Sequence, residues 1–290
     1  MSAAAGPLLT LKVHEALLAA RSSGAATLSC SLDLDRSTTT VELRADGWLW
    51  DGRLFPYLAS CKDRTIYYWL TAGADRDAGF EPVSRFTSSL IKLVPTPWGP
   101  PTFEIDGIKM LPTASVSPYA DAERKVGLIA PRGKLILDTC GGLGYFAAWC
   151  LRGQAVHVHS YESNPDVVWL RSLNPWSPDN RWLPNGAAAL TLTIADICQQ
   201  IVTLQPESVD AILHDPPRFG IAGELYSQQF YDQLARVLKR RGKLFHYTGS
   251  PNKLTSGRDV PNEVATRLRR AGFTTQINGD GIVAVRTASV

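Results

Sequence analysis

The 290-residue sequence is poor in the features that mark secreted, zinc-binding or membrane-spanning proteins. Its 5 cysteines are odd in number and include no CxxC pair, so we expect reduced thiols and no metal site. No run of about 18 apolar residues occurs, which excludes a transmembrane helix. The N-terminal segment lacks a basic stretch, and Lys12 and Glu15 interrupt its apolar positions, so no signal peptide is expected. We therefore expect a cytoplasmic protein with no membrane partner.

The excess of positive over negative charge is also small, because 30 Lys and Arg residues stand against 27 Asp and Glu residues. The formal net charge is +3, which is too small to indicate a nucleic-acid partner by itself. Hydrophobic residues make up 44% of the chain and charged residues 20%, as in ordinary globular proteins rather than disordered or coiled-coil ones. The chain is long for a single compact core, and we expect two domains.

The first part of the sequence is rich in strand patterns. Apolar side chains over residues 8–22 have helical spacing. Strand-forming residues then recur, which predicts strands at 27–34, 39–50 and 65–70. Asp106-Gly107 lies between TFEI and IKM and predicts a two-residue hairpin turn. We expect a β-rich domain over residues 1–115, then a linker and helix over 116–133.

From Lys134 onward, strand and helix patterns alternate, which indicates a parallel sheet covered by helices. Strands are expected at 134–139, 156–162, 188–195, 209–214, 243–248, 274–278 and 281–287. Helices are expected at 145–152, 164–173, 227–240 and 260–271. Only a short glycine-containing turn around Asp280 separates the last two strands, so that pair must be antiparallel. We predict an α/β, Rossmann-like domain over 134–290, with five parallel strands plus an antiparallel hairpin.

A glycine-rich loop follows the first of these strands, in KLILDTCGGLGYFAAW. Gly142 and Gly144 let the backbone turn tightly and approach a ligand at the start of the next helix. Gly142 opens a GxGxxA match to the dinucleotide fingerprint, and Glu162 follows 20 residues later, where a ribose-binding acid is expected. However, Asp138 ends the strand, and no Lys or Arg occurs from 135 to 151. That charge pattern favours cationic S-adenosylmethionine over a pyrophosphate.

Further acids follow the next strands, at the edge where ligands bind in such sheets. We expect Glu162 to bind the ribose hydroxyls, Asp196 the adenine amino group and Asp138 the methionine ammonium. Asp215 follows the fourth strand, and it and Ile197 are counted as further cofactor contacts. Any of these acids can instead cap a helix, and Asp196 before Ile197 is the leading case.

At these positions the sequence resembles the class I S-adenosylmethionine-dependent methyltransferases. Their nucleotide loop is written (D/E)xGxGxG, and its key positions here are Asp138, Cys140, Gly142 and Gly144. Cys140 replaces the first glycine, and the resemblance implies that it lines the cofactor. From about Leu90 to the end, the chain looks like a branch of predicted methyltransferases related to spermidine synthases. The similarity lies in LVPTPWGPPTFEIDGIKM, LDTCGGLGY, HDPPRFGIAGELYSQQFYDQLARVLKRRGKLFHYTGSP and GRDV.

The DPPR segment resembles the (D/N)PP(Y/F) motif of methyltransferases that act on planar amino nitrogens. The resemblance implies N-methyl transfer, in which the Asp215 side chain and a proline carbonyl orient an amino group toward the methyl. Pro216 and Pro217 supply the rigid backbone of this motif. Arg218 stands where many relatives carry an aromatic residue, so Phe219 is expected to supply the stacking surface. Alternatively, the two prolines only end a strand.

Other activities stay open as alternatives. An aminopropyltransferase of the spermidine-synthase type would use decarboxylated S-adenosylmethionine. Alignment with its DSxDPxGPAxxLY motif, however, puts Ile212 where a proton-accepting aspartate is needed. A C5-cytosine methyltransferase would need a nearby cysteine nucleophile, and none follows Asp215. An NAD-binding dehydrogenase and a non-catalytic cofactor-binding protein are the remaining candidates.

Three more side chains are candidates near the acceptor. His214 and His246 end adjacent strands and can act as bases or orient the substrate. A buried, hydrogen-bonded structural histidine is equally expected for either. Tyr226 can line a pocket over the methyl group. The acceptor itself, whether an RNA base, a protein or a small amine, and the oligomeric state are left open by the sequence.

Overall fold

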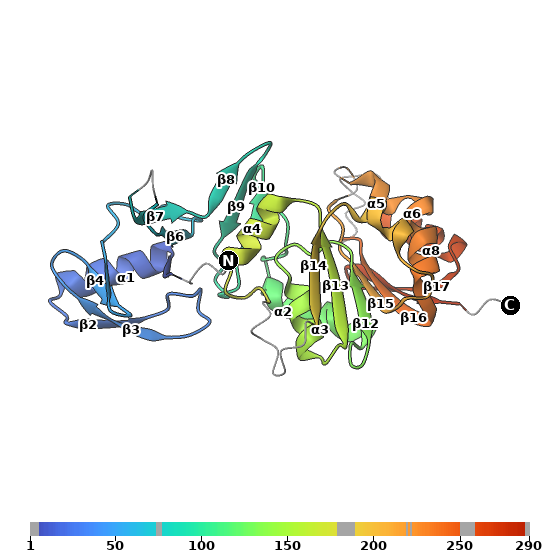
Figure 1. The fold of residues 1–290 in the computed structure, drawn as a ribbon, viewed down its shortest axis with the longest axis horizontal. Helices are drawn as coiled ribbons and strands as arrows, with labels where there is room; N and C mark the ends of the chain where they lie inside the picture. The colour runs from blue at the N-terminus through green and yellow to red at the C-terminus, as the bar shows by residue number, and fades with distance from the viewer. Residues whose placement is uncertain are drawn as a thin grey trace. The chain divides into compact units, whose positions relative to one another are not determined.

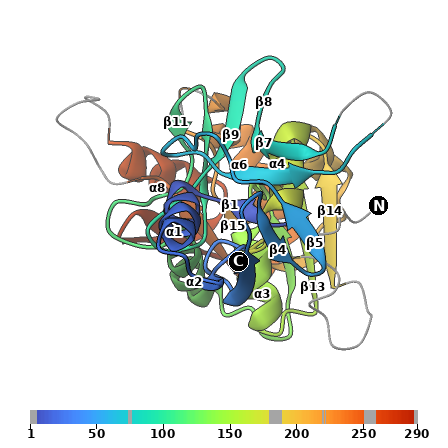
Figure 2. The same ribbon diagram turned by 90° about the vertical axis from the view of Figure 1, so that its left-hand side faces the viewer.

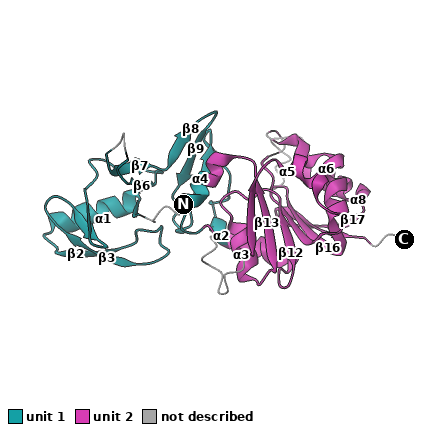
Figure 3. Ribbon diagram, viewed as in Figure 1, with its two compact units in different colours: residues 1–119, 169–176 teal, residues 120–168, 177–290 magenta. Residues whose placement is uncertain are grey.

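The protein is described by a computed structural model over residues 6–73, 77–178, 189–218, 220, 222–249 and 259–287. The chain forms two compact units (Figure 3). Unit 1 comprises residues 1–119 and 169–176, and unit 2 comprises residues 120–168 and 177–290. The division at 115 and 133 that the sequence suggests stays a prediction. No helix in the described ranges has the length and apolar character needed to cross a membrane.

Unit 1 contains helix α1, the last residues of α4 (Pro165–Leu173) and short antiparallel strands (Figures 1 and 2). Its elements are β1 (Leu8–Leu9), α1 (Leu11–Ser22), β2 (Thr27–Cys30), β3 (Thr39–Leu43), β4 (Trp48–Trp50), β5 (Arg53–Phe55), β6 (Tyr67–Leu70), β7 (Gly79–Pro82), β8 (Ser84–Phe86), β9 (Leu90–Val94), β10 (Thr102–Ile105) and β11 (Ile108–Lys109). They pair in three sheets with the orders β1-β6-β7, β2-β3-β4-β5 and β11-β10-β9-β8.

Turn chemistry explains where the strands of unit 1 begin and end. Asp106 and Gly107 have φ angles of 49° and 78°, as the predicted hairpin turn between β10 and β11 requires. The strand signal over 39–50 contains the turn dipeptide Asp46-Gly47, and this segment forms the paired strands β3 and β4. The helix expected from residue 8 begins at Leu11 instead, since β1 pairs with β6.

Aromatic side chains form the core of unit 1. The rings of Trp48 and Phe55, from neighbouring strands, stack with centroids 4.8 Å apart. Trp69 packs edge-on against Phe55 at 5.0 Å, and Phe80 packs against Trp69. Aromatic pairs stabilise a fold beyond the burial of their apolar area, because the rings prefer particular relative orientations. These preferences help to set how the short strands pack against one another.

Unit 2 contains a seven-stranded sheet with the order β14-β13-β12-β15-β16-β18-β17 (Figure 1). Its strands are β12 (Leu135–Asp138), β13 (His157–Glu162), β14 (Leu190–Ile194), β15 (Val209–His214), β16 (Leu238–Tyr247), β17 (Phe273–Asn278) and β18 (Gly281–Arg286). The first five are parallel, and β18 inserts antiparallel between β16 and β17. This confirms the predicted Rossmann-like sheet with its antiparallel hairpin.

Helices cover both faces of this sheet. The helices that follow α1 along the chain are α2 (Pro118–Ile129), α3 (Tyr145–Arg152), α4 (Pro165–Leu173), α5 (Ile197–Gln200), α6 (Gln228–Val237), α8 (Val260–Arg270) and the short turns η2 (Ile201–Thr203) and η3 (Gly223–Tyr226). Within unit 2, α2 and α3 lie on one face and α5, α6 and α8 on the other (Figure 1). Helix α6 ends at Val237 rather than at the expected residue 240, because Leu238 already pairs with Val209 as part of β16.

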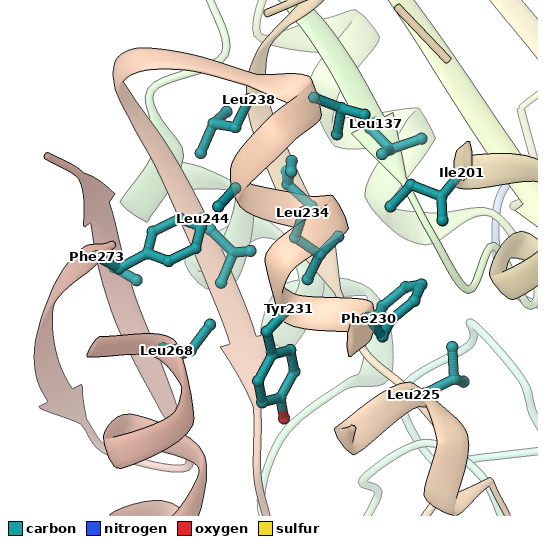
Figure 4. Packing of buried hydrophobic residues seen from close by; sticks show 14 of the residues in the cluster. Leu137, Ile201, Leu225, Phe230, Tyr231, Leu234, Leu238, Leu244, Leu268 and Phe273 are labelled. Carbon is teal, nitrogen blue, oxygen red and sulfur yellow. The ribbon is translucent and has the colours of Figure 1, made fainter. Parts of the chain in front are cut away.

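The core of unit 2 lies between the sheet and α6 (Figure 4). Phe230, Tyr231 and Leu234 recur at helical spacing, so one face of α6 points at the sheet. Leu244 of β16 and Leu268 of α8 are buried beside them. This packing fixes the strand ends that precede the candidate site.

Gly281 provides a test of the hairpin packing. A Cβ at this position would lie 2.6 Å from the Phe245 ring and 2.7 Å from the His246 carbonyl oxygen. We therefore predict that Gly281→Ala lowers the free energy of unfolding by about 1–3 kcal/mol. The control is Gly127→Ala in α2, where nothing lies within 4 Å and about 0.5–1 kcal/mol should be gained. Urea unfolding measures both, and equal stabilities would contradict the prediction.

Candidate active site

The candidate site lies where the strand order reverses. β12 and β15 are adjacent, and from them the chain continues outward to β13 on one side and to β16 on the other. Ligands of open parallel sheets bind at the carboxyl ends of the strands beside such a reversal. Asp138 ends β12, Glu162 ends β13 and Asp215 directly follows β15, so three carboxylates lie along this edge.

The glycine-rich loop is tied to the end of β13. The Gly141 amide donates to the Tyr161 carbonyl at 2.7 Å, and the Gly142 amide donates to Glu162 Oε2 at 2.9 Å. Gly142 has a φ of 48°, and Gly144, at the N-cap of α3, has a φ of 81°. Side-chain-bearing residues rarely adopt these angles, which explains the two glycines. The loop therefore brings its backbone against the Glu162 carboxylate.

Three carboxylates act electrostatically on the Cys140 thiol. Asp138 is fully buried and accepts a hydrogen bond from Ser160 Oγ at 2.8 Å. Glu162 Oε1 accepts from the Asn164 amide at 2.9 Å. Burial raises the pKa of the Cys140 thiol well above its ordinary value, and the charges of Glu162, Asp138 and Asp215 raise it further. The edge of the sheet therefore presents concentrated negative charge, as a cationic ligand requires.

Asp196 has the capping role that the sequence allowed. Its side chain accepts a hydrogen bond from the Cys198 amide at 2.8 Å, at the N-terminus of α5. Ile197 is buried and belongs to the hydrophobic core of unit 2. Both residues follow β14, and their contact with a cofactor stays a prediction.

Asp215 has the electrostatic character of a functional carboxylate. Its side chain is 19% exposed. Burial raises its pKa from 3.8 to about 6, partly opposed by the nearby Lys125 ammonium, while the charges of Asp121 and Asp280 raise it further. A carboxylate with such a pKa can exchange a proton near neutral pH.

The proline motif after Asp215 is held in place by Tyr226. The Tyr226 hydroxyl donates to the Pro217 carbonyl at 3.0 Å, and its ring is buried. Pro216 is buried and Arg218 is exposed. Phe219, the expected stacking residue, lies outside the described residues. Tyr226 thus contacts the proline motif. Its contact with the substrate stays a prediction.

His214 and His246 lie in the core with both ring nitrogens hydrogen-bonded. His214 Nδ1 is 2.7 Å from Thr139 Oγ1 and its Nε2 is 3.1 Å from the Leu225 carbonyl. Because a carbonyl only accepts, Nε2 carries the hydrogen. In the same way, His246 Nδ1 donates to the Tyr247 carbonyl at 2.7 Å. His246 Nε2 then accepts from the Tyr231 hydroxyl at 2.9 Å.

Burial lowers the pKa of both histidines. That of His214 falls to about 4, and that of His246 falls well below its ordinary value, with the neighbouring His214 as a second cause. Both rings are fully buried and are therefore neutral at physiological pH. This geometry favours the structural role over the expected catalytic role of His214 and the substrate contact of His246.

The sequence did not single out the charged groups that face Asp215 from other elements. Lys125 and Asp121 belong to α2, and Asp280 lies in the turn between β17 and β18. Lys125 Nζ is 2.7 Å from Asp121 Oδ2, 3.7 Å from Asp280 Oδ2 and 3.8 Å from Asp215 Oδ2. The sequence feature that could have indicated this cluster is the spacing of Asp121, Arg124 and Lys125. That spacing puts all three residues on one side of a helix.

The raised pKa of Asp215 makes a prediction about stability. Because this pKa is about 6 in the folded protein against 3.8 ordinarily, the folded state binds the proton more tightly than the unfolded state. Ionisation of Asp215 therefore lowers the free energy of unfolding as the pH rises from about 4 to 6. Above pH 6 the full loss of stability is present. We predict that Asp215→Asn raises the free energy of unfolding by about 3 kcal/mol at pH 8 and leaves it unchanged near pH 3.5.

Asp210 is the matched control with the opposite sign. Burial acts to raise its pKa, but the Lys239 ammonium at 2.7 Å and the Leu135 amide at 2.8 Å outweigh burial and hold it below its ordinary value. Asp210→Asn should therefore lose stability above about pH 4. Urea titrations at a series of pH values measure both variants. A stability loss for Asp215→Asn at pH 8 would contradict the prediction.

Comparison with known proteins agrees with this architecture. Residues 167–254 match a family described as S-adenosyl-L-methionine-dependent methyltransferase. The chain is 41% identical over 199 residues to the uncharacterized protein MJ1233 of Methanocaldococcus jannaschii. That match covers 67% of this chain and 66% of the relative's length.

Solved structures share the fold at low sequence identity. Spermidine synthase from Thermotoga maritima has a TM-score of 0.54 at 15% identity, over 77% of this chain and 80% of that one. A spermidine synthase in complex with the transition-state analogue AdoDATO gives 0.56 at 15% identity, with the same coverage. MnmC2 from Aquifex aeolicus gives 0.51 at 18% identity, over 71% of this chain and 73% of that one.

At these identities the likeness concerns the fold, so the choice among activities depends on the family match. That match favours methyl transfer over the dehydrogenase, aminopropyltransferase and non-catalytic alternatives. Residues 167–254 thus resemble a family of S-adenosyl-L-methionine-dependent methyltransferases, and they lie in a chain whose glycine loop and sheet have the matching fold.

Proposed function

We propose that this enzyme transfers a methyl group from S-adenosylmethionine to an amino nitrogen of its acceptor. The observation that carries the proposal is the position of Asp215. It directly follows β15 at the strand-order reversal, it is partly exposed, and its pKa is about 6. The adjoining prolines and the Tyr226 clamp on Pro217 give the motif a fixed backbone.

The residues of the cofactor loop fit a cationic cofactor. We assign Asp138 to the methionine ammonium and Glu162 to the ribose hydroxyls, with Asp196 near the adenine amino group. The Gly142 amide and the Glu162 carboxylate already form one hydrogen-bonded unit, so the carboxylate has a defined orientation. A dinucleotide would bring two negative phosphates against Asp138 and Glu162, and like charges at short range repel.

When bound, S-adenosylmethionine supplies a methyl on positively charged sulfur, and the acceptor lone pair forms the new N–C bond as the C–S electron pair stays on sulfur. The protein's contribution is chiefly orientation. We propose that the Asp215 carboxylate and the Pro216 carbonyl accept hydrogen bonds from the acceptor amino group. Holding the reacting atoms within about 3–3.5 Å supplies much of the acceleration for such a displacement. The two neutral histidines stabilise the strand ends beneath this motif.

The chemistry of the cysteines argues against a covalent mechanism. A cysteine nucleophile must ionise readily. Burial raises the pKa of Cys140 well above its ordinary value and that of Cys198 to about 12, so both thiols stay protonated. Ile212, at the position of the expected aspartate of aminopropyltransferases, is fully buried in β15. Direct methyl transfer is therefore better supported than either alternative.

Two finer points belong to the proposal. We also propose a cytoplasmic location, a reducing environment that keeps free thiols such as the five cysteines reduced. The acceptor belongs to one of three classes, an RNA base, a protein or a small amine, and its amino group is the common feature.

Cofactor binding tests the carboxylate assignment. We predict that the wild-type protein binds S-adenosylmethionine in calorimetry, and that it binds NADH and decarboxylated S-adenosylmethionine far more weakly. Asp138→Ala should abolish binding, because the ammonium loses its counter-charge. The control is Asp232→Ala on α6, which removes an exposed carboxylate outside the site and should bind normally. Normal binding by the Asp138 variant would mean that the ammonium is held elsewhere.

Turnover tests the role of Asp215. The protein is incubated with a radiolabelled methyl donor and a cell extract, which is then separated into RNA, protein and metabolite fractions. We predict label in one fraction. Asp215→Ala should keep cofactor affinity and reduce the labelling rate about 100-fold or more. A variant that labels at the wild-type rate would remove Asp215 from the mechanism.

A further inference from the structure

Lys125 is a buried cation beside the proposed catalytic carboxylate. Its side chain is 1% exposed, which is rare for a lysine unless it is paired. Its ammonium forms one short contact, at 2.7 Å to Asp121 Oδ2. Two longer contacts follow, at 3.7 Å to Asp280 Oδ2 and 3.8 Å to Asp215 Oδ2. Three separate parts of unit 2 thus bring a carboxylate to this one ammonium.

Aromatic rings close the remaining sides. Lys125 Nζ lies 4.1 Å from the centroid of the Tyr247 ring, at the end of β16. The rings of Phe146 in α3 and Phe245 in β16 lie 6.0 and 5.9 Å away. Aromatic faces attract a cation and exclude water, so the ammonium is held in place and its field is poorly screened.

Arg124 fixes the two carboxylates that do not belong to the proline motif. It donates to Asp121 Oδ1 at 2.9 Å and to Asp280 Oδ1 at 2.6 Å. Each of these acids is therefore bound by a guanidinium as well as facing the lysine. Asp215 faces Lys125 alone in this group, at a distance beyond a direct hydrogen bond.

A count of the charges shows which carboxylate carries the excess negative charge. Asp121, Asp215 and Asp280 face Lys125 and Arg124, so three carboxylates face two cations and one negative charge is left over. The excess belongs to Asp215, since the two other acids have the shorter contacts. The pKa of Asp215 agrees, because burial and the two other acids raise it while Lys125 lowers it. Tyr226, Tyr247 and Cys140 also face this carboxylate and stay uncharged, since their own pKa values are raised.

We propose that Lys125 is a positioning residue that keeps the Asp215 carboxylate ionised and oriented, so that Asp215 can accept the proton that the acceptor nitrogen loses on methylation. The role rests on the proposed N-methyl transfer. Asp121, Arg124 and Asp280 hold Lys125 in place. The nitrogen gains a methyl and loses one proton, the carboxylate becomes a carboxylic acid, and the proton then passes to solvent. No further reactant is needed.

The test measures Asp215 without any acceptor. The carboxyl carbons of aspartate are labelled with ¹³C, and the Asp215 signal is assigned by its loss in Asp215→Asn. In Lys125→Met, which keeps the side-chain volume and removes the charge, the midpoint of the Asp215 titration should rise by about 1–3 pH units. The control is Lys239→Met, which breaks a similar 2.7 Å pair with Asp210 at the other end of β15. It should leave the Asp215 midpoint unchanged.

A second variant keeps the proposal testable if Lys125→Met does not fold. Asp280 lies in a turn and is 20% exposed, so Asp280→Asn should be tolerated. It removes a like charge, and the Asp215 midpoint should fall. An unchanged midpoint in Lys125→Met, or an unchanged or raised midpoint in Asp280→Asn, overturns the proposal.

The pH dependence of the methylation rate distinguishes a failure of this proposal from a failure of the proposed function. In the labelling assay, the acid limb of the rate profile should move to higher pH in Lys125→Met, by the same amount as the Asp215 midpoint. A residue with a purely structural role would lower the rate at every pH. Shifted midpoints without any methyl transfer would refute the proposed function and leave the charge network intact. Methyl transfer with an unmoved acid limb would refute the role of Lys125.

Discussion

The site depends on gathering carboxylates where water is scarce. Asp138, Glu162 and Asp215 lie along one edge of a parallel sheet because each ends or follows a strand that the core holds in register. Burial disfavours an ionised carboxylate, and neighbouring negative charges disfavour it further. The ionised carboxylates therefore need groups that stabilise their negative charge. In unit 2 these groups are backbone amides, the Ser160 hydroxyl and the buried Lys125 ammonium.

These compensations differ along the edge, and the difference fits the separate roles proposed for Glu162 and Asp215. Glu162 accepts from two backbone amides, at 2.9 Å each, which fix its position without neutralising it. Asp215 faces a cation at 3.8 Å and keeps a pKa of about 6. The first arrangement suits a constant counter-charge, and the second suits a group that accepts and releases a proton. Under the proposed function, the cost of ionising Asp215 is tolerated because the chemistry needs that carboxylate, a trade-off that is common at active sites.

Local patterns predicted the sheet, the glycine loop and the strand-end acids, because each depends on residues close in sequence. The φ angles of Gly142 and Gly144 and the turn at Asp106-Gly107 follow from backbone sterics alone. The role of Lys125 could not be predicted this way, since its partners Asp215 and Asp280 come from distant parts of the chain. The histidines were ambiguous for the same reason. Their neutrality follows from burial, and their tautomers follow from Thr139, Leu225 and Tyr231, which only the tertiary fold brings to the rings.

The same charge network bears on the kind of acceptor that the site can take. A pocket for a polyamine needs several uncompensated carboxylates, one for each ammonium of the substrate. Here Arg124 and Lys125 bring two positive charges against Asp121, Asp215 and Asp280, so this group carries only one net negative charge. A single carboxylate beside a rigid proline backbone matches one neutral amino group that becomes positive only as the methyl arrives. Stabilising charge that develops in the transition state, rather than charge already present on the substrate, is what accelerates the chemical step.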